Sequence, residues 1–218
     1  MTLTRLLFLL AIAHIAVWVN AKEIGITTVD GLIAATPDAR NLNVSASGSL
    51  ETNGPEYRAQ LVQLDQDYPY QQILIFRMAS NGEYVLADQS KQMDYMGGSG
   101  NWKVQSLEFR DTSLFVTFGG HWHQCSHSYT SQFRLQYGAL HEVGVESWEE
   151  NVERNLVVRS SMNFLTGKAY SISGSINKKY TTERGKKRQY RIEQQRRPFS
   201  KFDGSPYHLP YYKEHPVC

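Results

Sequence analysis

Cysteine is scarce in this sequence, with only Cys125 and Cys218 among 218 residues. Small secreted folds that depend on disulfides carry many more cysteines, and cysteine zinc sites show paired Cys-x-x-Cys spacings. The sequence therefore excludes a disulfide-built scaffold and a closed zinc site of that kind. In an oxidising compartment the two cysteines could still pair, so Cys125 and Cys218 are a candidate disulfide.

Long hydrophobic runs are absent after the N-terminus. The best internal run, residues 73–76, is only four residues long, whereas a transmembrane helix needs about 20 apolar residues. We therefore expect no transmembrane segment in the mature chain.

The first 21 residues have the pattern of a secretory signal peptide. Arg5 supplies the positive charge, residues 6–19 are almost all apolar, and Val19-Asn20-Ala21 offers a cleavage site. We expect cleavage after Ala21, which leaves a secreted or periplasmic protein of 197 residues that begins at Lys22.

Common catalytic signatures are also missing. The sequence has no Gly-x-Ser-x-Gly elbow, no P-loop and no dinucleotide-binding fingerprint. Serine and histidine are frequent, so a catalytic triad is not excluded, but no set can be nominated. The sequence favours a binding protein over an enzyme.

A long amphipathic helix is absent as well, and short strands take its place. Segments rich in Val, Ile, Phe and Tyr recur about every ten residues between turn signals, the spacing typical of an antiparallel meander, sandwich or propeller-like sheet. We expect a single all-β domain over residues 57–177, after an irregular lead-in at 22–56 with one or two short strands. The sequon Asn43-Val44-Ser45 lies in that lead-in.

Several hairpins can be placed from their turns. Strands at 72–78 and 84–87 flank Ser80-Asn81-Gly82, and strands at 102–109 and 114–118 flank Arg110-Asp111-Thr112. Residues 121–134 are interpreted as the next strand, followed by a Tyr137-Gly138 turn. The last hairpin joins 155–164 to 168–176 through Leu165-Thr166-Gly167, whereas 57–64 fits a strand or a short helix.

Several of these segments resemble secreted bacterial β-domains with a distant likeness to FG-GAP, or integrin-type, repeats. The resemblance covers residues 57–176 and rests on Ser128-Tyr129, on Phe133 to Gly138 and on Asn163 to Lys168. It implies a β-repeat architecture but no catalytic residues.

FG-GAP repeats carry an acidic calcium loop before a buried strand, and Asp65-Gln66-Asp67 occupies the matching place. The following residues, 68–72, supply neither the glycine nor the further oxygen ligands that calcium needs. We therefore interpret this segment as a solvated acidic turn.

The most suggestive segment for metal chemistry is residues 121–127. In one extended strand, His121, His123, Cys125 and His127 would project from the same face about 7 Å apart, and imidazole and thiolate ligands suit zinc or copper. The alternative is a solvated or groove-facing side of a sheet, with Cys125 committed to a disulfide that removes the thiolate.

Glutamates cluster near Trp148, as they do in some carbohydrate sites. They are Glu146, Glu149, Glu150 and Glu153. We interpret them as a solvated acidic turn in a hairpin connection.

Charge divides the chain at about residue 178. Residues 22–177 carry 11 basic and 17 acidic side chains, whereas residues 178–201 carry 10 and 2. We expect residues 178–218 to form a basic, largely extended tail that binds a polyanion, folds back on the acidic domain, or stays unstructured. The candidate polyanion-binding residues are Lys186, Lys187, Arg188, Arg191, Arg196 and Arg197.

Together these features predict an exported, non-catalytic binding protein that presents the sheet around residues 121–127 to a protein or an envelope component. The alternative from another class is a zinc- or copper-dependent enzyme, or a metal-binding protein, that uses His121, His123 and His127.

Overall fold

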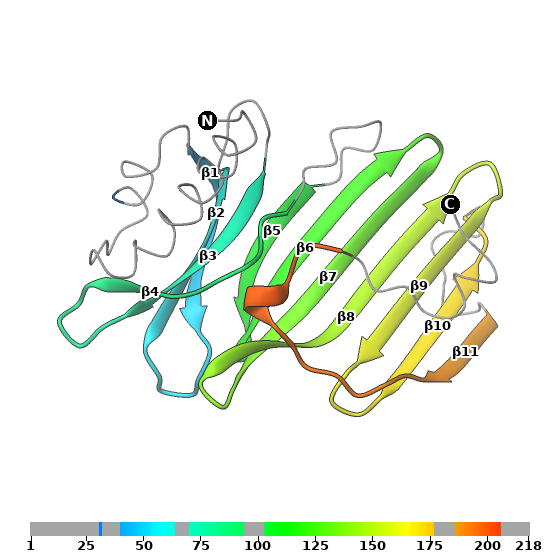
Figure 1. Cartoon of the computed structure of the whole chain (residues 1–218). Helices are drawn as coiled ribbons and strands as arrows, with labels where there is room; N and C mark the ends of the chain where they lie inside the picture. The colour runs from blue at the N-terminus through cyan, green and yellow to red at the C-terminus, as the bar shows by residue number, and fades with distance from the viewer. Residues whose placement is uncertain (1–30, 32–39, 64–69, 94–102, 177–185, 206–218) are drawn as a thin grey trace, which may run out of the picture.

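The computed structural model describes residues 31, 40–63, 70–93, 103–176 and 186–205. This part of the chain is nearly all β and forms two antiparallel sheets, neither of which closes into a barrel (Figure 1). The prediction of a single all-β domain is confirmed. Within these residues, no helix has the length and apolar character needed to span a bilayer.

The smaller sheet has four strands in the order β1-β2-β3-β4. Its elements are β1 (Arg40–Ser49), β2 (Glu56–Gln63), β3 (Gln71–Met78) and β4 (Tyr84–Gln89). The segment 57–64 fits a strand or a short helix by its sequence, and residues 57–63 of it belong to the strand β2. β1 is a ten-residue strand inside the segment that we expected to be irregular.

The larger sheet is a meander with the order β11-β10-β9-β8-β7-β6-β5. Its strands are β5 (Lys103–Arg110), β6 (Ser113–Trp122), β7 (Cys125–Gln136), β8 (Ala139–Asn151), β9 (Leu156–Asn163), β10 (Lys168–Gly174) and β11 (Lys186–Arg191), while β12 (Arg197–Pro198) pairs with the start of β8. The predicted turns at 110–112, 137–138 and 165–167 all join strands of this meander.

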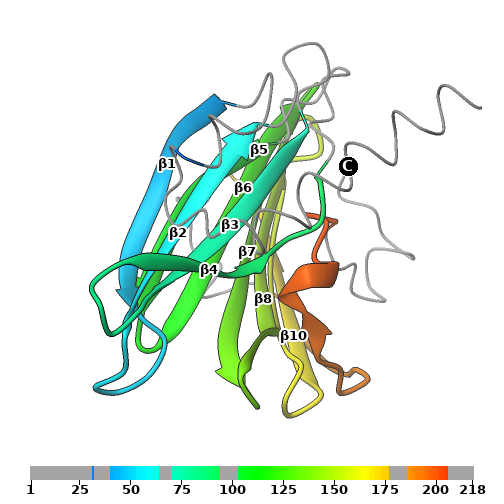
Figure 2. The same ribbon diagram turned by 60° about the vertical axis from the view of Figure 1, so that its left-hand side comes forward.

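The main core lies between the two sheets, which face each other at β5–β7 (Figure 2). Ile73 and Ile75 of β3 and Val116 and Phe133 of the large sheet are all buried there. We call this side of the large sheet its inner face, and the opposite side its outer face.

Part of the predicted basic tail completes this core. The 3-10 helix η2 (Phe199–Lys201) and the residue after it place Phe199 and Phe202 against Phe133, with ring centroids 5.0 and 4.9 Å from that of Phe133. Arg197 also donates a hydrogen bond to the fully buried Glu142, with Nε 2.9 Å from Oε2. The described residues of the tail therefore fold back on the domain.

The prediction of one continuous strand through residues 121–134 is wrong. β6 ends at Trp122, a two-residue turn follows, and β7 begins at Cys125, with Trp122 paired to Cys125. His123 adopts the left-handed conformation in this turn, with φ 53°. The turn contains no Gly, Asn, Asp or Pro, so the usual signal for a hairpin is missing.

Candidate functional site

The outer face of β7–β10 carries a groove whose side chains are set by strand register. Residues paired across neighbouring strands point to the same face of a sheet. One row across the sheet therefore consists of Ser128, Trp148, Arg159 and Ile172, and the next row consists of Thr130, Glu146, Ser161 and Tyr170.

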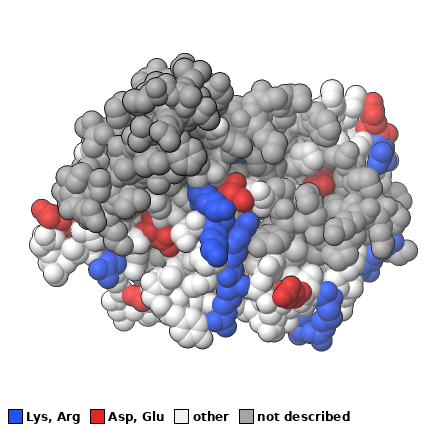
Figure 3. Space-filling view, viewed as in Figure 1, with Lys and Arg blue, Asp and Glu red and all other residues white. Residues whose placement is uncertain are grey.

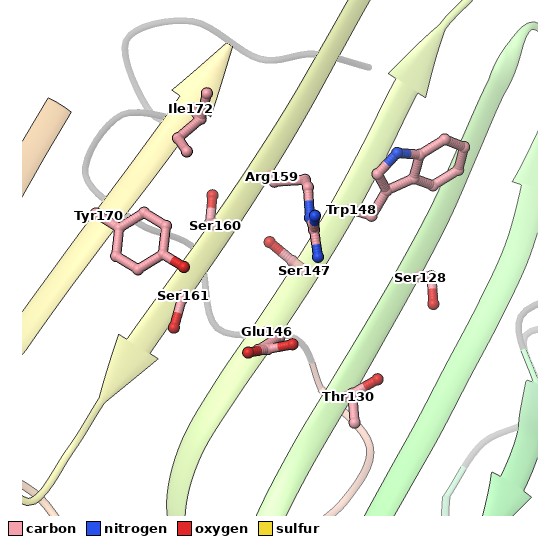
Figure 4. A pocket seen from close by; sticks show the side chains of 10 residues that line it. All are labelled: Ser128, Thr130, Glu146, Ser147, Trp148, Arg159, Ser160, Ser161, Tyr170 and Ile172. Carbon is pink, nitrogen blue, oxygen red and sulfur yellow. The ribbon is translucent and has the colours of Figure 1, made fainter. Parts of the chain in front are cut away.

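These two rows line a groove of about 260 Å³ (Figure 4). Ser147 and Ser160 complete its lining. In Figure 4, Arg159 directs its guanidinium and Tyr170 its hydroxyl toward the middle of the groove, where the Glu146 carboxylate lies. The groove thus offers acidic, basic, hydroxyl and aromatic groups within two rows.

The two charged side chains of the groove, Glu146 and Arg159, are exposed. Within the described part of the chain, neither has a hydrogen-bond or ion-pair partner. A carboxylate accepts hydrogen bonds and a guanidinium only donates them. The groove therefore presents both functions to a ligand.

The ends of the groove are fixed by neighbouring contacts. Thr130 Oγ1 lies 3.1 Å from Thr117 Oγ1 of β6, which holds the hydroxyl at one end. At the other end, Lys187 Nζ lies 4.9 Å from the centroid of the Tyr170 ring. This cation–π contact places a positive charge beside the groove.

The structure does not bring the four candidate metal ligands together. His121 pairs with Ser126, whose hydroxyl lies 2.9 Å from His121 Nδ1. Since Ser126 and His127 are neighbours in β7, His121 and His127 point to opposite faces of the sheet. Among the described residues, no group of three or more His, Cys, Asp or Glu side chains is arranged to hold a metal ion.

Cys125 is disulfide-bonded, so its sulfur is not a thiolate. It is buried on the inner face, where the Asn151 side-chain amide donates to its sulfur at 3.4 Å. Cys218, the other member of the candidate disulfide, lies outside the described residues.

The cluster of glutamates is not a hairpin connection, because three of its members lie within β8. Glu146 lines the groove on the outer face, and Glu150 lies four residues further along that face. Glu149 is buried on the inner face, where it accepts a hydrogen bond from Tyr129 Oη at 2.9 Å. Glu153 is exposed, as Glu146 is, and lies in the turn after β8.

The candidate polyanion-binding residues are distributed over several surfaces. Lys187 and Arg191 are exposed on the outer face of β11, and Arg188 points to the inner face. Arg196 lies over the Tyr137 ring at 5.4 Å. Arg197 is paired with Glu142, and the side chain of Lys186 lies outside the described residues.

A second basic feature lies on the inner side of the molecule. Lys and Arg side chains gather in a stripe that runs over η2 (Figure 3). Arg197 of β12, directly before η2, is held by Glu142 and Asp203, the latter at 3.4 Å.

Three other predictions fall wholly or partly on residues that the structure does not describe. Asp65 and Asp67 of the acidic turn lie outside the described residues, as do residues 1–30 with the predicted signal peptide. The backbone of Asn43 belongs to β1, but its side chain is likewise outside the description.

Sequence reasoning noticed Glu146 and Trp148 but missed the rest of the groove. A usable signal existed in the last hairpin, because the turn at 165–167 sets Arg159 opposite Ile172 and Ser161 opposite Tyr170. Polar and aromatic residues on one face of two paired strands would have indicated a surface site.

Comparisons with family models, with curated proteins and with solved structures find no match to this chain. The resemblance to FG-GAP repeats therefore stays a prediction, and the function is argued from the groove itself.

Proposed function

We propose that the chain is an exported, non-catalytic protein that binds a saccharide in the groove on the outer face of β7–β10. The N-terminal pattern of a positive charge, an apolar run and a small-residue cleavage site supports export. The side chains that line the groove support a saccharide as the ligand.

The observation that carries the proposal is the set of three side chains Glu146, Trp148 and Arg159. Sugar hydroxyls both donate and accept hydrogen bonds, so one ring can satisfy the Glu146 carboxylate and the Arg159 guanidinium together. The apolar C–H face of the ring can then pack on Trp148, which is half-buried and directly paired with Arg159. The Ser and Thr hydroxyls of the lining supply further polar contacts.

The strand geometry favours binding at this site over hydrolysis of the sugar. Glycosidases use two carboxyl groups about 5 to 9.5 Å apart. Glu146 is the one carboxylate among the residues that line the groove, and Glu150 lies four residues further along β8. Their backbones are about 13 Å apart at the rise of an extended strand.

The sheet also provides a stiff platform for binding. The groove spans four hydrogen-bonded strands, and its opposite side is buried through Val145, Val158, Met162 and Ala169. Side chains on such a scaffold lose little freedom when a ligand binds, which favours affinity.

The alternative function, a zinc- or copper-dependent protein, stays a prediction. Its test is metal analysis of the purified protein together with a His123→Ala variant. Stoichiometric zinc or copper that is lost in the variant would favour this alternative.

A binding experiment tests the saccharide proposal. Purified protein is titrated with a panel of neutral and acidic oligosaccharides and followed by calorimetry, alongside Glu146→Gln and the control Glu108→Gln. Glu108 is exposed on the outer face of β5, away from the groove. We expect at least one saccharide to bind, with binding weakened by Glu146→Gln and unchanged by Glu108→Gln. No binding to any member at millimolar concentration contradicts the proposal.

A further inference from the structure

We infer that the ligand is an acidic polysaccharide, such as a chain of uronic acids, which runs from the groove across β9 and β10 toward β11. This inference rests on the proposed function and adds the charge and the direction of the ligand. It is carried by the unequal distribution of charge over the outer face.

The acidic and basic residues of this face lie on different strands. The outer-face carboxylates of β7–β11 are Glu146 and Glu150, both on β8. β9, β10 and β11 contain no Asp or Glu at any position. Their exposed outer-face cations are Arg159, Lys168, Lys187 and Arg191.

Register places these cations in two rows. Arg159 and Lys187 share the row of Trp148, with Ile172 between them. Lys168 and Arg191 are directly paired, two rows further along the strands. Because neighbouring strands are about 4.8 Å apart, Arg159 and Lys187 are about 10 Å apart at the backbone.

This spacing suits a polyanion. The Debye length is about 8 Å at physiological salt, so cations about 10 Å apart are largely screened from one another, and each attracts the ligand carboxylate that lies against it. The side chains of Arg159, Lys168 and Arg191 also have no hydrogen-bond or ion-pair partner within the described part of the chain. Their charges are available to a ligand.

The size of the groove indicates part of a longer ligand. Sites that enclose small molecules measure about 300–1,000 Å³, and this groove holds about 260 Å³. It would therefore hold only a short stretch of the chain, while the rest lies over the exposed rows toward β11.

Glu146 decides between an acidic saccharide and a nucleic acid. A carboxylate in the groove repels phosphates and uronates alike, but the uronic acid ring carries hydroxyls that donate hydrogen bonds to it, which the backbone of DNA lacks. A uronic acid chain offers hydroxyls to Glu146 and carboxylates to the cations, so it satisfies both kinds of group.

The test compares two ligands with the same sugar backbone, one charged and one neutral. Oligomers of polygalacturonate and their fully methyl-esterified counterparts are titrated into the full protein at about 50 and about 200 mM salt. We expect the acidic oligomer to bind roughly tenfold more tightly at the lower salt and to weaken as salt rises. Equal affinities for the two oligomers overturn the inference but leave the saccharide proposal intact. Binding of neither oligomer also overturns the inference, and the panel titration then decides the saccharide proposal separately.

Variants locate the charge effect. The double variant Lys187→Gln/Arg191→Gln should lose about fivefold or more in affinity for the acidic oligomer and keep its affinity for the ester. Lys103→Gln is the matched control, because Lys103 is an exposed cation on the outer face of β5. An equal loss in both variants overturns the inference, as does tighter binding of a twelve-nucleotide thymidine oligomer than of polygalacturonate.

Discussion

Trp148 on β8 and Arg159 on β9 are directly paired across the two strands. The pairing places an aromatic residue and a guanidinium on neighbouring strands of the outer face, and the guanidinium points toward the Glu146 carboxylate (Figure 4). The proposed ligand site depends on this arrangement.

Replacement of Trp148 by alanine should weaken saccharide binding without unfolding the protein. The half-buried indole lies on the outer face, away from the main core. We expect a loss of affinity of about tenfold, or ~1.4 kcal/mol, because the ring no longer covers the apolar side of the sugar. Calorimetry measures the affinity and circular dichroism the fold. Trp148→Phe should recover part of the affinity, and unchanged binding by Trp148→Ala would place the ligand elsewhere.

Glycine at position 112 should stabilise the turn between β5 and β6. Asp111 and Thr112 both have positive φ, 49° and 58°, as a type I′ turn requires. A β-branched residue is strained in this region, whereas glycine is not. We expect Thr112→Gly to raise the free energy of unfolding by about 0.5–1 kcal/mol in urea denaturation.

The turn between β7 and β8 provides the reverse experiment. Gly138 has φ 80° and open space around it, so a side chain there meets conformational strain but no steric contact. Gly138→Thr should lower the free energy of unfolding by about 1–2 kcal/mol. A stable Gly138→Thr protein would show that these turns do not limit stability.

A side chain at Gly48 should not be tolerated, because the two sheets approach each other closely there. A Cβ atom at Gly48 of β1 would overlap the Cβ of Phe109 on β5. We expect Gly48→Val to cost about 1–3 kcal/mol, because the backbones must separate. Ser47→Val is the control, since Ser47 is exposed on the same strand. Similar thermal unfolding of the two variants would contradict this account of the sheet junction.

The buried pair of Glu142 and Arg197 should make stability depend on pH. Burial raises the pKa of Glu142 above its usual value of 4.5, against the lowering effect of Arg197. The folded protein therefore keeps the proton at pH values where the unfolded chain has lost it. The free energy of unfolding should fall as pH rises through the window above 4.5, and in Glu142→Gln this fall should disappear.

Arg197→Gln tests the same pair from the other side. It leaves the Glu142 carboxylate buried without its counter-ion, which costs about 3–5 kcal/mol at neutral pH. Because protonation of Glu142 relieves this cost, we expect the variant to recover stability as pH falls. Adding Glu142→Gln should also recover stability at pH 7. Denaturation curves at pH 7 and at a lower pH measure the two effects.

The fold could be predicted wherever the sequence contains residues typical of hairpin turns. Asn81-Gly82 is a turn sequence, and the strands on either side of it were predicted correctly. The Tyr137-Gly138 turn was also predicted, although the strand before it was wrongly extended back to residue 121. The turn at His123-Gln124 carries no such chemistry, and the continuous strand predicted there led to the hypothesis of four aligned metal ligands.

The groove could not be predicted from the sequence because of a β-bulge in β8. Gln132 pairs with Gly144 but Phe133 pairs with Glu142, so Val143 is an extra residue in the ladder. One extra residue reverses which side chains of the following strand face outward. Residues 146 and 148 reach the outer face only because of this bulge, which depends on the packed sheet and not on a local signal.

The most direct test of the account is a nuclear magnetic resonance titration of the ¹⁵N-labelled protein with polygalacturonate oligomers. We expect the largest shift changes at the Trp148 indole N–H and at the backbone amides around Glu146, Arg159 and Tyr170. Shift changes confined to β1–β4, or none at millimolar ligand, would contradict a saccharide site on the outer face.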